Sequence, residues 1–418
     1  MRAVAPVFNV AMRTATLGTR FALVFILAKF LDAAALGLYG LFTAAIGYAL
    51  LCFGLDLYVY TTREIVRVER AAQGHMLKSH AALVSLLYVA LAPAMLWILP
   101  QVGLPSNLLQ WFLPILVLEH LNQEIFRLLI IYSKQLTASA LLFLRQGSWA
   151  IAVAAIMSLS DGARNLNFVM LAWASAGALA AFAGLWTLHR MRLGGWREAV
   201  DWAWIRKGVR ISGVFLIATL SIRAIQTIDR FWLQDLASIQ LVGAYVLFFG
   251  VSSALSVFLD ASIFSFRYPE LIVLGNEEKF DQLHRKVGQM AVNTVGAIAL
   301  FAVASSLTLP VLLSWIGRDI YNAQIDLYYW ILAATTVYSL AMVPHYALYA
   351  MGRDKPIIAS HFAGLVVFII GTLAFIHVSR AYAVPMGVLL GMFVVLIWKS
   401  GAYFKILFGA HRRRFNSQ

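Results

Sequence analysis

Hydrophobic runs of about 20 residues recur along nearly the whole chain, and short polar segments separate them. A helix of that length crosses the hydrocarbon core of a bilayer. The strands of a membrane barrel would be about ten residues long and would alternate in polarity, and these runs do not alternate. The pattern therefore predicts an all-α polytopic membrane protein with twelve transmembrane helices. The predicted spans are Val10–Phe30, Gly37–Tyr58, His80–Pro100, Gln110–Tyr132, Ser139–Ser160, Asn167–Leu188, Val209–Leu233, Val242–Phe264, Gln289–Ile316, Tyr328–Ala350, Ile357–Val378 and Ala383–Leu407.

Composition supports a membrane protein and leaves little sequence for anything else. Hydrophobic residues make up 61% of the chain, charged residues make up 12%, and the mean hydropathy is +0.79, which is too apolar for a soluble fold. No nucleophile, nucleotide-binding or metal-ligand motif is visible, so we expect no enzyme activity, no cofactor and no metal site. The first run carries Arg13 and Arg20 and lacks a clear cleavage site, so we expect it to remain as a span rather than act as a signal peptide.

Positive side chains gather in alternate connections between the predicted spans. The connections on one side hold nearly all of the lysines and arginines, whereas those on the other side hold only Arg164, Arg318 and Arg380. Because cytoplasmic loops are enriched in Lys and Arg, this asymmetry predicts that both termini are cytoplasmic. The net charge of +14 then reflects topology and contact with anionic lipid headgroups rather than binding of nucleic acid.

The predicted spans divide the chain into two halves. We expect an N-terminal six-helix lobe over 1–190, a cytoplasmic amphipathic connector over 191–207, and a C-terminal six-helix lobe with a basic cytoplasmic tail over 208–418. Within the connector, Gly195–Lys207 would form a helix lying in the plane of the membrane interface. A second cytoplasmic connection, Arg267–Lys286, is predicted to form another short surface helix.

A short pattern occurs in both halves. Leu36-Gly37-Leu38-Tyr39 at the start of the second span recurs as Val242-Gly243-Ala244-Tyr245 at the start of the eighth. The helix before each copy carries two arginines seven residues apart, which is about two helical turns, so each pair shares one helix face. Such a duplication fits parallel repeats with a substrate handled between the halves, although convergent loop chemistry gives the same short match. The arginine pairs are Arg13 with Arg20 and Arg223 with Arg230.

These features together resemble the polysaccharide-flippase branch of the multidrug/oligosaccharidyl-lipid/polysaccharide exporter superfamily. The resemblance rests on the small-residue-rich first span with its arginines, on Leu36–Gly40, on Gly54 and on the basic loop from Arg63. It implies two pseudo-symmetric six-helix lobes around a central cavity, with an isoprenoid-diphosphate-linked oligosaccharide as substrate. It also implies the inner (cytoplasmic) membrane of a bacterium, with a polysaccharide polymerase and export machinery as partners in O-antigen or exopolysaccharide assembly.

Charged residues inside the predicted spans indicate which substrate the chain suits. Nine are cationic and five are acidic, and this excess favours an anionic substrate because arginine binds phosphate oxygens bidentately. Arg20 and Arg223 lie near the middle of their helices and are the first candidates for binding a diphosphate headgroup. Arg13 and Arg145 lie roughly 10 Å or less from the cytoplasmic boundary, where they either meet the headgroup or extend to the interface. The cations are Arg13, Arg20, Lys29, Arg127, Arg145, Arg210, Arg223, Arg230 and Lys399, and the acids are Asp56, Glu119, Glu124, Asp229 and Asp260.

Other polar groups in the spans have simpler explanations. Lys29, Arg210 and Lys399 are within reach of an interface, so we expect their side chains to extend to it. Arg230 adjoins Asp229 and is expected to pair with it. The isolated histidines of the tenth and eleventh spans, His345, His361 and His377, are expected to have only structural roles.

The fourth span is the most polar. Glu119, Gln123 and Arg127 share one helix face, and Glu124 can reach either His120 or Arg127. Two interpretations stay open: a buried polar stripe in which Glu124 neutralises Arg127, and a proton-coupling or substrate-contact site. Glu119 is the better coupling candidate of the two acids, because Arg127 is closer to Glu124.

The sequence thus predicts a flippase that moves lipid-linked oligosaccharide from the cytoplasmic to the outer leaflet by alternating access. A multidrug or small-metabolite antiporter of the same fold is the first alternative, and it would use Glu119, Glu124 and Asp260 as its key groups. The second alternative is a membrane enzyme, such as a polymerase, acting on the same lipid-linked sugars. That enzyme would need a large outer loop, and the outer connections here are short.

Overall fold

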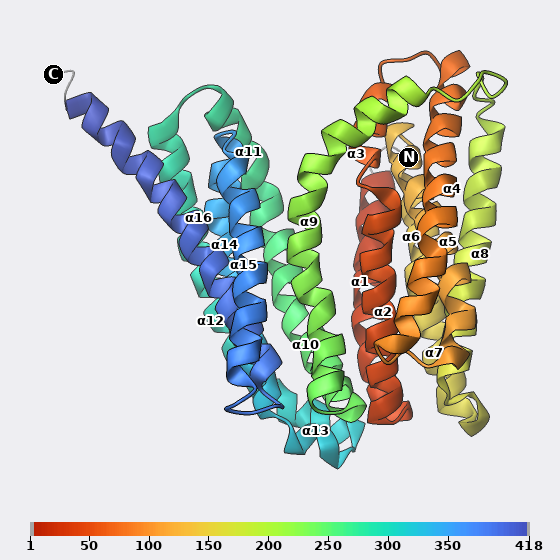
Figure 1. Ribbon diagram of the computed structural model, residues 1–418, viewed down its shortest axis with the longest axis vertical. Helices are drawn as coiled ribbons and strands as arrows, with labels where there is room; N and C mark the ends of the chain where they lie inside the picture. The colour runs from red at the N-terminus through yellow and green to blue at the C-terminus, as the bar shows by residue number, and fades with distance from the viewer. Residues whose placement is uncertain (1–3, 416–418) are drawn as a thin grey trace. The chain divides into compact units, whose positions relative to one another are not determined.

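The structure is a computed structural model that describes the backbone of residues 4–415 and the side chains of 8–213 and 216–407. Every regular element in this described part is a helix. Two compact units, Met1–Ile217 and Ala218–Gln418, divide inside α9 (Figure 1). The elements of the first are α1 (Val4–Phe30), α2 (Ala33–Gly54), α3 (Tyr58–Ile65), α4 (Arg70–Gln101), α5 (Ser106–Ile131), α6 (Gln135–Phe143), η1 (Leu144–Ser148), α7 (Trp149–Leu159), η2 (Asp161–Ala163), α8 (Leu166–Arg190) and the first part of α9 (Trp202–Leu236). The rest of α9 is followed by α10 (Ile239–Leu259), η3 (Asp260–Phe264), α11 (Ser265–Asn276), α12 (Phe280–Ile316), α13 (Asp319–Ala323), α14 (Asp326–Ala350), α15 (Asp354–Phe375) and α16 (Ala383–Phe415).

Each of the twelve predicted spans coincides with one long helix or with consecutive helical segments. Within the described residues, ten helices are long and apolar enough to cross a membrane. Helix α9 makes eleven when Trp202–Gly213 and Leu216–Leu236 are taken as one span. The remaining predicted span is α5, which has 26 residues but carries the polar groups of the fourth predicted span. The all-α polytopic fold is therefore confirmed.

Helices α2 and α10, which carry the repeated sequence pattern, also begin in the same way. Asp32 caps α2 by accepting a hydrogen bond from a backbone N–H at 2.6 Å, and Ser238 caps α10 in the same manner at 3.2 Å. Tyr39 and Tyr245 follow at equal distances from these caps, and both are buried. The similarity between the two halves therefore extends from sequence to local structure.

The second span ends earlier than predicted. Leu55 and Asp56 adopt left-handed backbone conformations with φ of 48° and 50°, so α2 stops before them and the short helix α3 follows. At the corresponding point of the second half, α10 continues through the π-helical segment η3 into α11. Both halves thus depart from regular α-helix at this position.

The predicted amphipathic helix over Gly195–Lys207 is wrong in its first half, because this part is irregular and α9 starts only at Trp202. Helix α4 binds the backbone of the irregular part. Lys78 Nζ donates hydrogen bonds to the carbonyl oxygens of Trp196, at 3.2 Å, and Glu198, at 2.7 Å. Gly195, with φ of 87°, has a backbone conformation outside the α-helical range, and these bonds join the irregular segment to α4.

The segment Arg267–Lys286 is also not a separate surface helix. Helix α11 continues into it and α12 begins after a turn of three residues, 277–279. Glu270 pairs with Arg267 at 3.2 Å and with Lys286 at 2.7 Å, so one carboxylate joins the ends of the two helices. The connection is therefore a tight helical hairpin.

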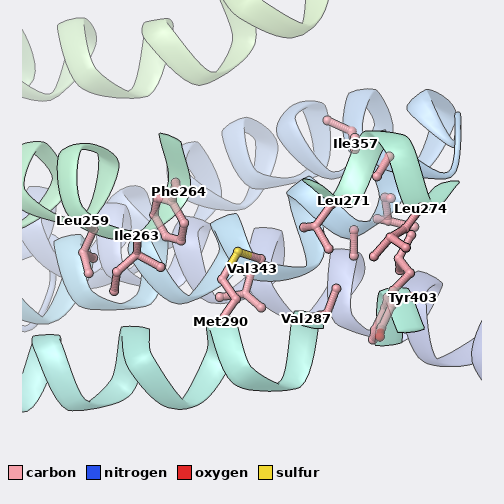
Figure 2. Close-up of a cluster of buried hydrophobic side chains, with 14 of the residues drawn as sticks. Leu259, Ile263, Phe264, Leu271, Leu274, Val287, Met290, Val343, Ile357 and Tyr403 are labelled. Carbon is pink, nitrogen blue, oxygen red and sulfur yellow. The ribbon is translucent and has the colours of Figure 1, made fainter. Parts of the chain in front are cut away.

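Around this hairpin, side chains from α10, η3, α11, α12, α14, α15 and α16 form one hydrophobic cluster (Figure 2). Figure 2 shows Met290 of α12 beside Val343 of α14, with Phe264 and Ile263 of η3 nearby. Tyr403 connects α16 to this cluster, and its hydroxyl lies 2.7 Å from His284 Nδ1 of α12. The cluster fixes one end of the C-terminal unit.

In the N-terminal unit, the connections predicted to be cytoplasmic lie at the same end. The Tyr132 hydroxyl, just after α5, donates a hydrogen bond to Gln73 Oε1 at the start of α4 (2.8 Å). At the opposite end, the guanidinium of Arg164 lies 4.8 Å from the ring centre of Phe30. The arrangement agrees with the predicted alternation of the loops. That the basic end faces the cytoplasm stays a prediction.

Candidate functional site

The helix that carries Arg145 is interrupted by the π-helical segment η1, which joins α6 to α7. A π turn widens the helix locally and is frequent at functional sites. Arg145 lies in this turn and is only 5% exposed. Its side chain therefore does not extend to the membrane interface, which excludes one of the two predicted alternatives for this residue.

Glu119 of α5 is the ionic partner of Arg145. Arg145 Nη2 lies 3.7 Å from Glu119 Oε2, and Trp173 Nε1 of α8 donates a hydrogen bond to Glu119 Oε1 at 2.8 Å. Arg145 Nε and Nη1 are buried and have no hydrogen-bond partner among the described residues. The guanidinium thus keeps donor atoms beyond those that face Glu119.

Both arginines of the first span face the helix that contains η1. Arg13 Nε donates to Ser139 Oγ at 3.3 Å, and Arg20 Nη1 donates to Gln146 Oε1 at 3.2 Å. The two contacts have the same sequence separation, 126 residues, so the two helices run side by side in the same direction. Both arginine side chains are exposed in their unit, and neither pairs with a carboxylate among the described residues.

We call Arg20, Glu119, Arg145, Gln146 and Trp173 the N-terminal polar cluster. Arg145 lies within electrostatic range of Arg20 as well as of Glu119. Two guanidinium groups and one carboxylate leave the cluster with a net positive charge. Aromatic rings border it, because the ring of Trp173 stacks on another indole at 5.8 Å and is edge-on to a phenylalanine at 6.0 Å. These rings belong to Trp149 and Phe42.

The rest of the fourth span matches the polar-stripe interpretation. Glu124 and Arg127 form an ion pair, and the Arg127 guanidinium lies 3.5 Å from the ring centre of Tyr58. His120 contacts neither of them by a hydrogen bond and instead lies 3.3 Å from the Tyr88 hydroxyl through Nδ1. Glu124 therefore has its charge compensated locally, whereas a coupling role for Glu119 stays a prediction.

In the C-terminal unit, Arg223 resembles Arg20. Its side chain is exposed, and Nη1 donates a hydrogen bond to Gln226 Oε1 at 3.2 Å. Arg230 and Asp229 interact electrostatically, and the Arg230 backbone N–H donates a hydrogen bond to Asp229 Oδ1 at 2.7 Å, but their side chains bond to other groups. Arg230 Nη1 donates to the Gln226 carbonyl at 2.7 Å, and Asp229 Oδ2 accepts from the Tyr245 hydroxyl at 2.8 Å. Consecutive helical residues point about 100° apart, which explains the separate partners.

Lys399 departs furthest from its predicted position. It is fully buried, with 0% exposure, and its Nζ lies 3.0 Å from His361 Nε2. The predicted extension of this side chain to the interface is therefore wrong. Its burial follows from close packing of α15 on α16, where a Cβ on Gly391 would lie 2.8 Å from the Gly364 carbonyl oxygen.

Sequence reasoning also missed partners that are uncharged or aromatic. Trp173, Gln146 and His80 gave no sequence signal beyond a polar atom in an apolar run, and His80 Nδ1 lies 3.1 Å from Thr61 Oγ1. Among the described residues, no group of three or more His, Cys, Asp or Glu side chains is placed to hold a metal ion. The N-terminal polar cluster therefore combines two guanidinium groups, an amide and an indole with one carboxylate, and its excess of guanidinium groups suits an anion.

No family model matches this chain, and the search of curated proteins gave no match. Solved structures of MATE transporters share its fold. An inward-facing multidrug resistance MATE family transporter of the MOP superfamily matches with a TM-score of 0.75 at 12% identity, covering 93% of this chain and 94% of that chain. An outward-facing transporter of the same description matches with a TM-score of 0.53 at 13% identity, covering 97% and 93%. A mutant of the Vibrio cholerae MATE transporter VcmN matches with a TM-score of 0.53 at 13% identity, covering 98% and 92%.

At these identities the comparisons establish the fold. The chain has the fold of MATE transporters of the MOP superfamily, as the sequence resemblance implied. The polysaccharide branch of that superfamily is not represented among these structures.

Proposed function

We propose that this chain is an alternating-access membrane transporter whose substrate carries an anionic headgroup, namely an isoprenoid-diphosphate-linked oligosaccharide. One observation carries the proposal. Arg20 and Arg223 lie near the middle of their spans with exposed side chains, and each is hydrogen-bonded to a glutamine amide oxygen. An amide leaves the positive charge uncompensated, and an uncompensated cation at membrane depth is costly unless water or an anion meets it. An anionic substrate supplies that partner.

The N-terminal polar cluster supports the same substrate class. Its net charge is positive, and Arg145 has two buried donor atoms without partners among the described residues. Guanidinium groups bind phosphate oxygens through paired hydrogen bonds, so Arg20 and Arg145 suit a diphosphate better than a single lysine would. In this proposal Arg13 is a further contact nearer the cytoplasmic end.

The membrane potential favours outward movement of such a substrate. Moving one net negative charge out of a cell gains about 2.3 kcal/mol per 100 mV. The proposed direction is therefore from the cytoplasmic to the outer leaflet of a bacterial inner membrane, with both chain termini in the cytoplasm. A polysaccharide polymerase and export machinery would then use the product on the outer side.

The test uses proteoliposomes with a fluorescent isoprenoid-diphosphate-linked oligosaccharide in one leaflet. Arg20→Ala and Arg223→Ala should abolish its translocation, and Arg20→Lys should retain part of it. Arg20→Lys loses one charge-assisted hydrogen bond, which costs about 1.5 kcal/mol and should slow translocation about tenfold. Arg67→Ala is the matched control, because Arg67 forms an exposed surface ion pair with Glu64. Full activity of both alanine variants would remove these arginines from the site.

A multidrug antiporter is the second candidate, and the comparisons favour it over the first, because two of the similar solved structures are described as multidrug resistance transporters. Such a protein needs acidic groups for cationic substrates. Glu119 and Glu124 are already paired with arginines here, which leaves the exposed Asp260 as the available acid among the three predicted ones. Efflux of a cationic dye that is lost in Asp260→Asn but kept in Arg20→Ala would establish this candidate instead.

A further inference from the structure

Three helices of the C-terminal unit enclose a cluster of basic groups that the proposed substrate site does not use. Lys399 of α16 is fully buried, and its Nζ lies 3.0 Å from Nε2 of His361 on α15. The imidazole of His345 on α14 stacks against that of His361, with ring centres 6.2 Å apart and planes 8° apart. We call these three residues the basic triad.

The geometry of the triad allows only some combinations of protonation. An ammonium group has three donors and no acceptor, so His361 Nε2 must accept when Lys399 is charged, and His361 is then neutral. If Nε2 were protonated instead, Lys399 would have to be a neutral amine. Lys399 and His361 together therefore hold one positive charge at most.

No acid in the described part of the chain stabilises that charge. Among the described residues Lys399 has no carboxylate within ion-pair distance, unlike Arg127, Arg145 and Arg267. The titratable groups facing it are His361 from α15 and His345 from α14. Tyr403, one turn further along α16, bonds to His284 of α12. A buried ammonium without a carboxylate is far less stable than the same group in water.

A second acceptor lies next to the pair. His345 Nδ1 is buried and has no hydrogen-bond partner among the described residues. The imidazole of His345 therefore offers a second proton acceptor beside His361, to whose ring it lies parallel. Glycines 364 and 391 hold α15 and α16 at the short separation that this contact requires.

We infer that the basic triad is a proton-binding site that couples transport to the transmembrane pH gradient. In the loaded state Lys399 Nζ carries three protons and donates one hydrogen bond to His361 Nε2. Release of one proton leaves a neutral amine that still donates to Nε2, and the proton departs to water by way of the histidines. The coupling role rests on the proposed transport function, whereas proton binding itself does not.

Proton binding is tested without any substrate. The protein is labelled with 15N-lysine, placed in lipid bilayers, and examined by solid-state NMR at about pH 5 and pH 9, on either side of the ordinary histidine pKa of about 6.5. The signal lost in Lys399→Met identifies Nζ of this residue. It should change from ammonium to amine across this range, whereas an ordinary lysine side chain, with a pKa of about 10.4, does not. An ammonium signal for Lys399 at both pH values would overturn the inference.

Coupling is tested in proteoliposomes with and without a pH gradient. A gradient of one pH unit supplies about 1.4 kcal/mol per proton. With this gradient the wild type should accumulate about tenfold more substrate than without a gradient. Lys399→Met and Lys399→Arg should lose this tenfold gain but keep gradient-independent exchange, because methionine binds no proton and arginine does not release one. Lys405→Met and His377→Gln are exposed controls on α16 and after α15 that should keep it. Retention of the full gain in Lys399→Arg would show that only a fixed charge is needed, and would overturn the coupling role.

The two tests separate the possible failures. If Lys399 changes from ammonium to amine as expected but the protein does not transport the lipid-linked substrate, the proposed function is contradicted and the proton-binding site is not. If Lys399 changes from ammonium to amine as expected but transport does not depend on the pH gradient, only the coupling role is contradicted.

Discussion

Glu119 and Arg145 form an ion pair of 3.7 Å in which both side chains are more than nine-tenths buried. The two residues belong to different helical elements, Glu119 to α5 and Arg145 to the π-helical turn η1. Because burial removes the solvation of both charges, each group depends on the other. A substitution in this pair should therefore affect both the proposed site and the stability of the N-terminal unit.

Removing one member of this pair should destabilise the protein strongly. Glu119→Gln keeps an oxygen that accepts from Trp173 Nε1 but leaves the charge of Arg145 uncompensated, so we expect a loss of about 3 kcal/mol in the free energy of unfolding. The measurement is denaturant unfolding in detergent. The double variant Glu119→Gln/Arg145→Gln should regain part of the loss, and a double variant less stable than either single variant would contradict the ion-pair account.

The buried carboxylate of Asp229 should depend on the hydroxyl of Tyr245. Asp229 is 1% exposed and accepts this hydrogen bond at 2.8 Å. Tyr245→Phe removes the donor without changing the ring, so the expected loss is about 1.5–3 kcal/mol, as for other hydrogen bonds to charged groups. Tyr329→Phe, at a half-exposed tyrosine, is the control and should change unfolding little. Equal stability of the two variants would show that Asp229 has another sufficient partner.

The contact between α15 and α16 should not tolerate a large side chain. A Cβ at Gly391 would meet the Gly364 carbonyl oxygen at 2.8 Å, so Gly391→Leu must separate the helices. We expect a loss of about 1–3 kcal/mol in unfolding free energy, typical of overpacking. Gly401→Leu on the same helix should be tolerated, because no atom lies within 4 Å of its Cβ position. Thermal unfolding followed by circular dichroism compares the two variants, and equal melting temperatures would contradict the packing argument.

The helical architecture could be predicted from the sequence because a helix that crosses the hydrocarbon core of a bilayer needs a run of about 20 mostly apolar residues. All twelve predicted spans coincide with helices, including α5, whose polar groups exclude it from a search by hydropathy alone. The connections were predicted less well. Gly195–Lys207 has the spacing of an amphipathic helix, yet its carbonyl groups bond to Lys78, which is far away in sequence.

Side-chain partners across helices were the least predictable part of the candidate site. Spacing along α5 indicated Glu124 with Arg127, since three residues bring both to one face. It gave no sign that Glu119 would meet Arg145, because the two residues lie on different helices. Lys399 was assigned to the interface from its distance to a helix end. Its burial depends instead on glycines of two helices, which a single-helix pattern does not reveal.

The π turn over Leu144–Ser148 contains one residue more than an α-helical turn does. Residues of an α-helix advance by about 100° each, and the wider turn absorbs the extra residue, so α7 keeps the phase that a regular helix one residue shorter would give it. Deleting a single residue there should therefore restore regular coiling while Trp149 stays stacked on Trp173 and Ser139 stays opposite Arg13. The change would be confined to the turn that carries Arg145, and its contact with Glu119 would be the first to alter.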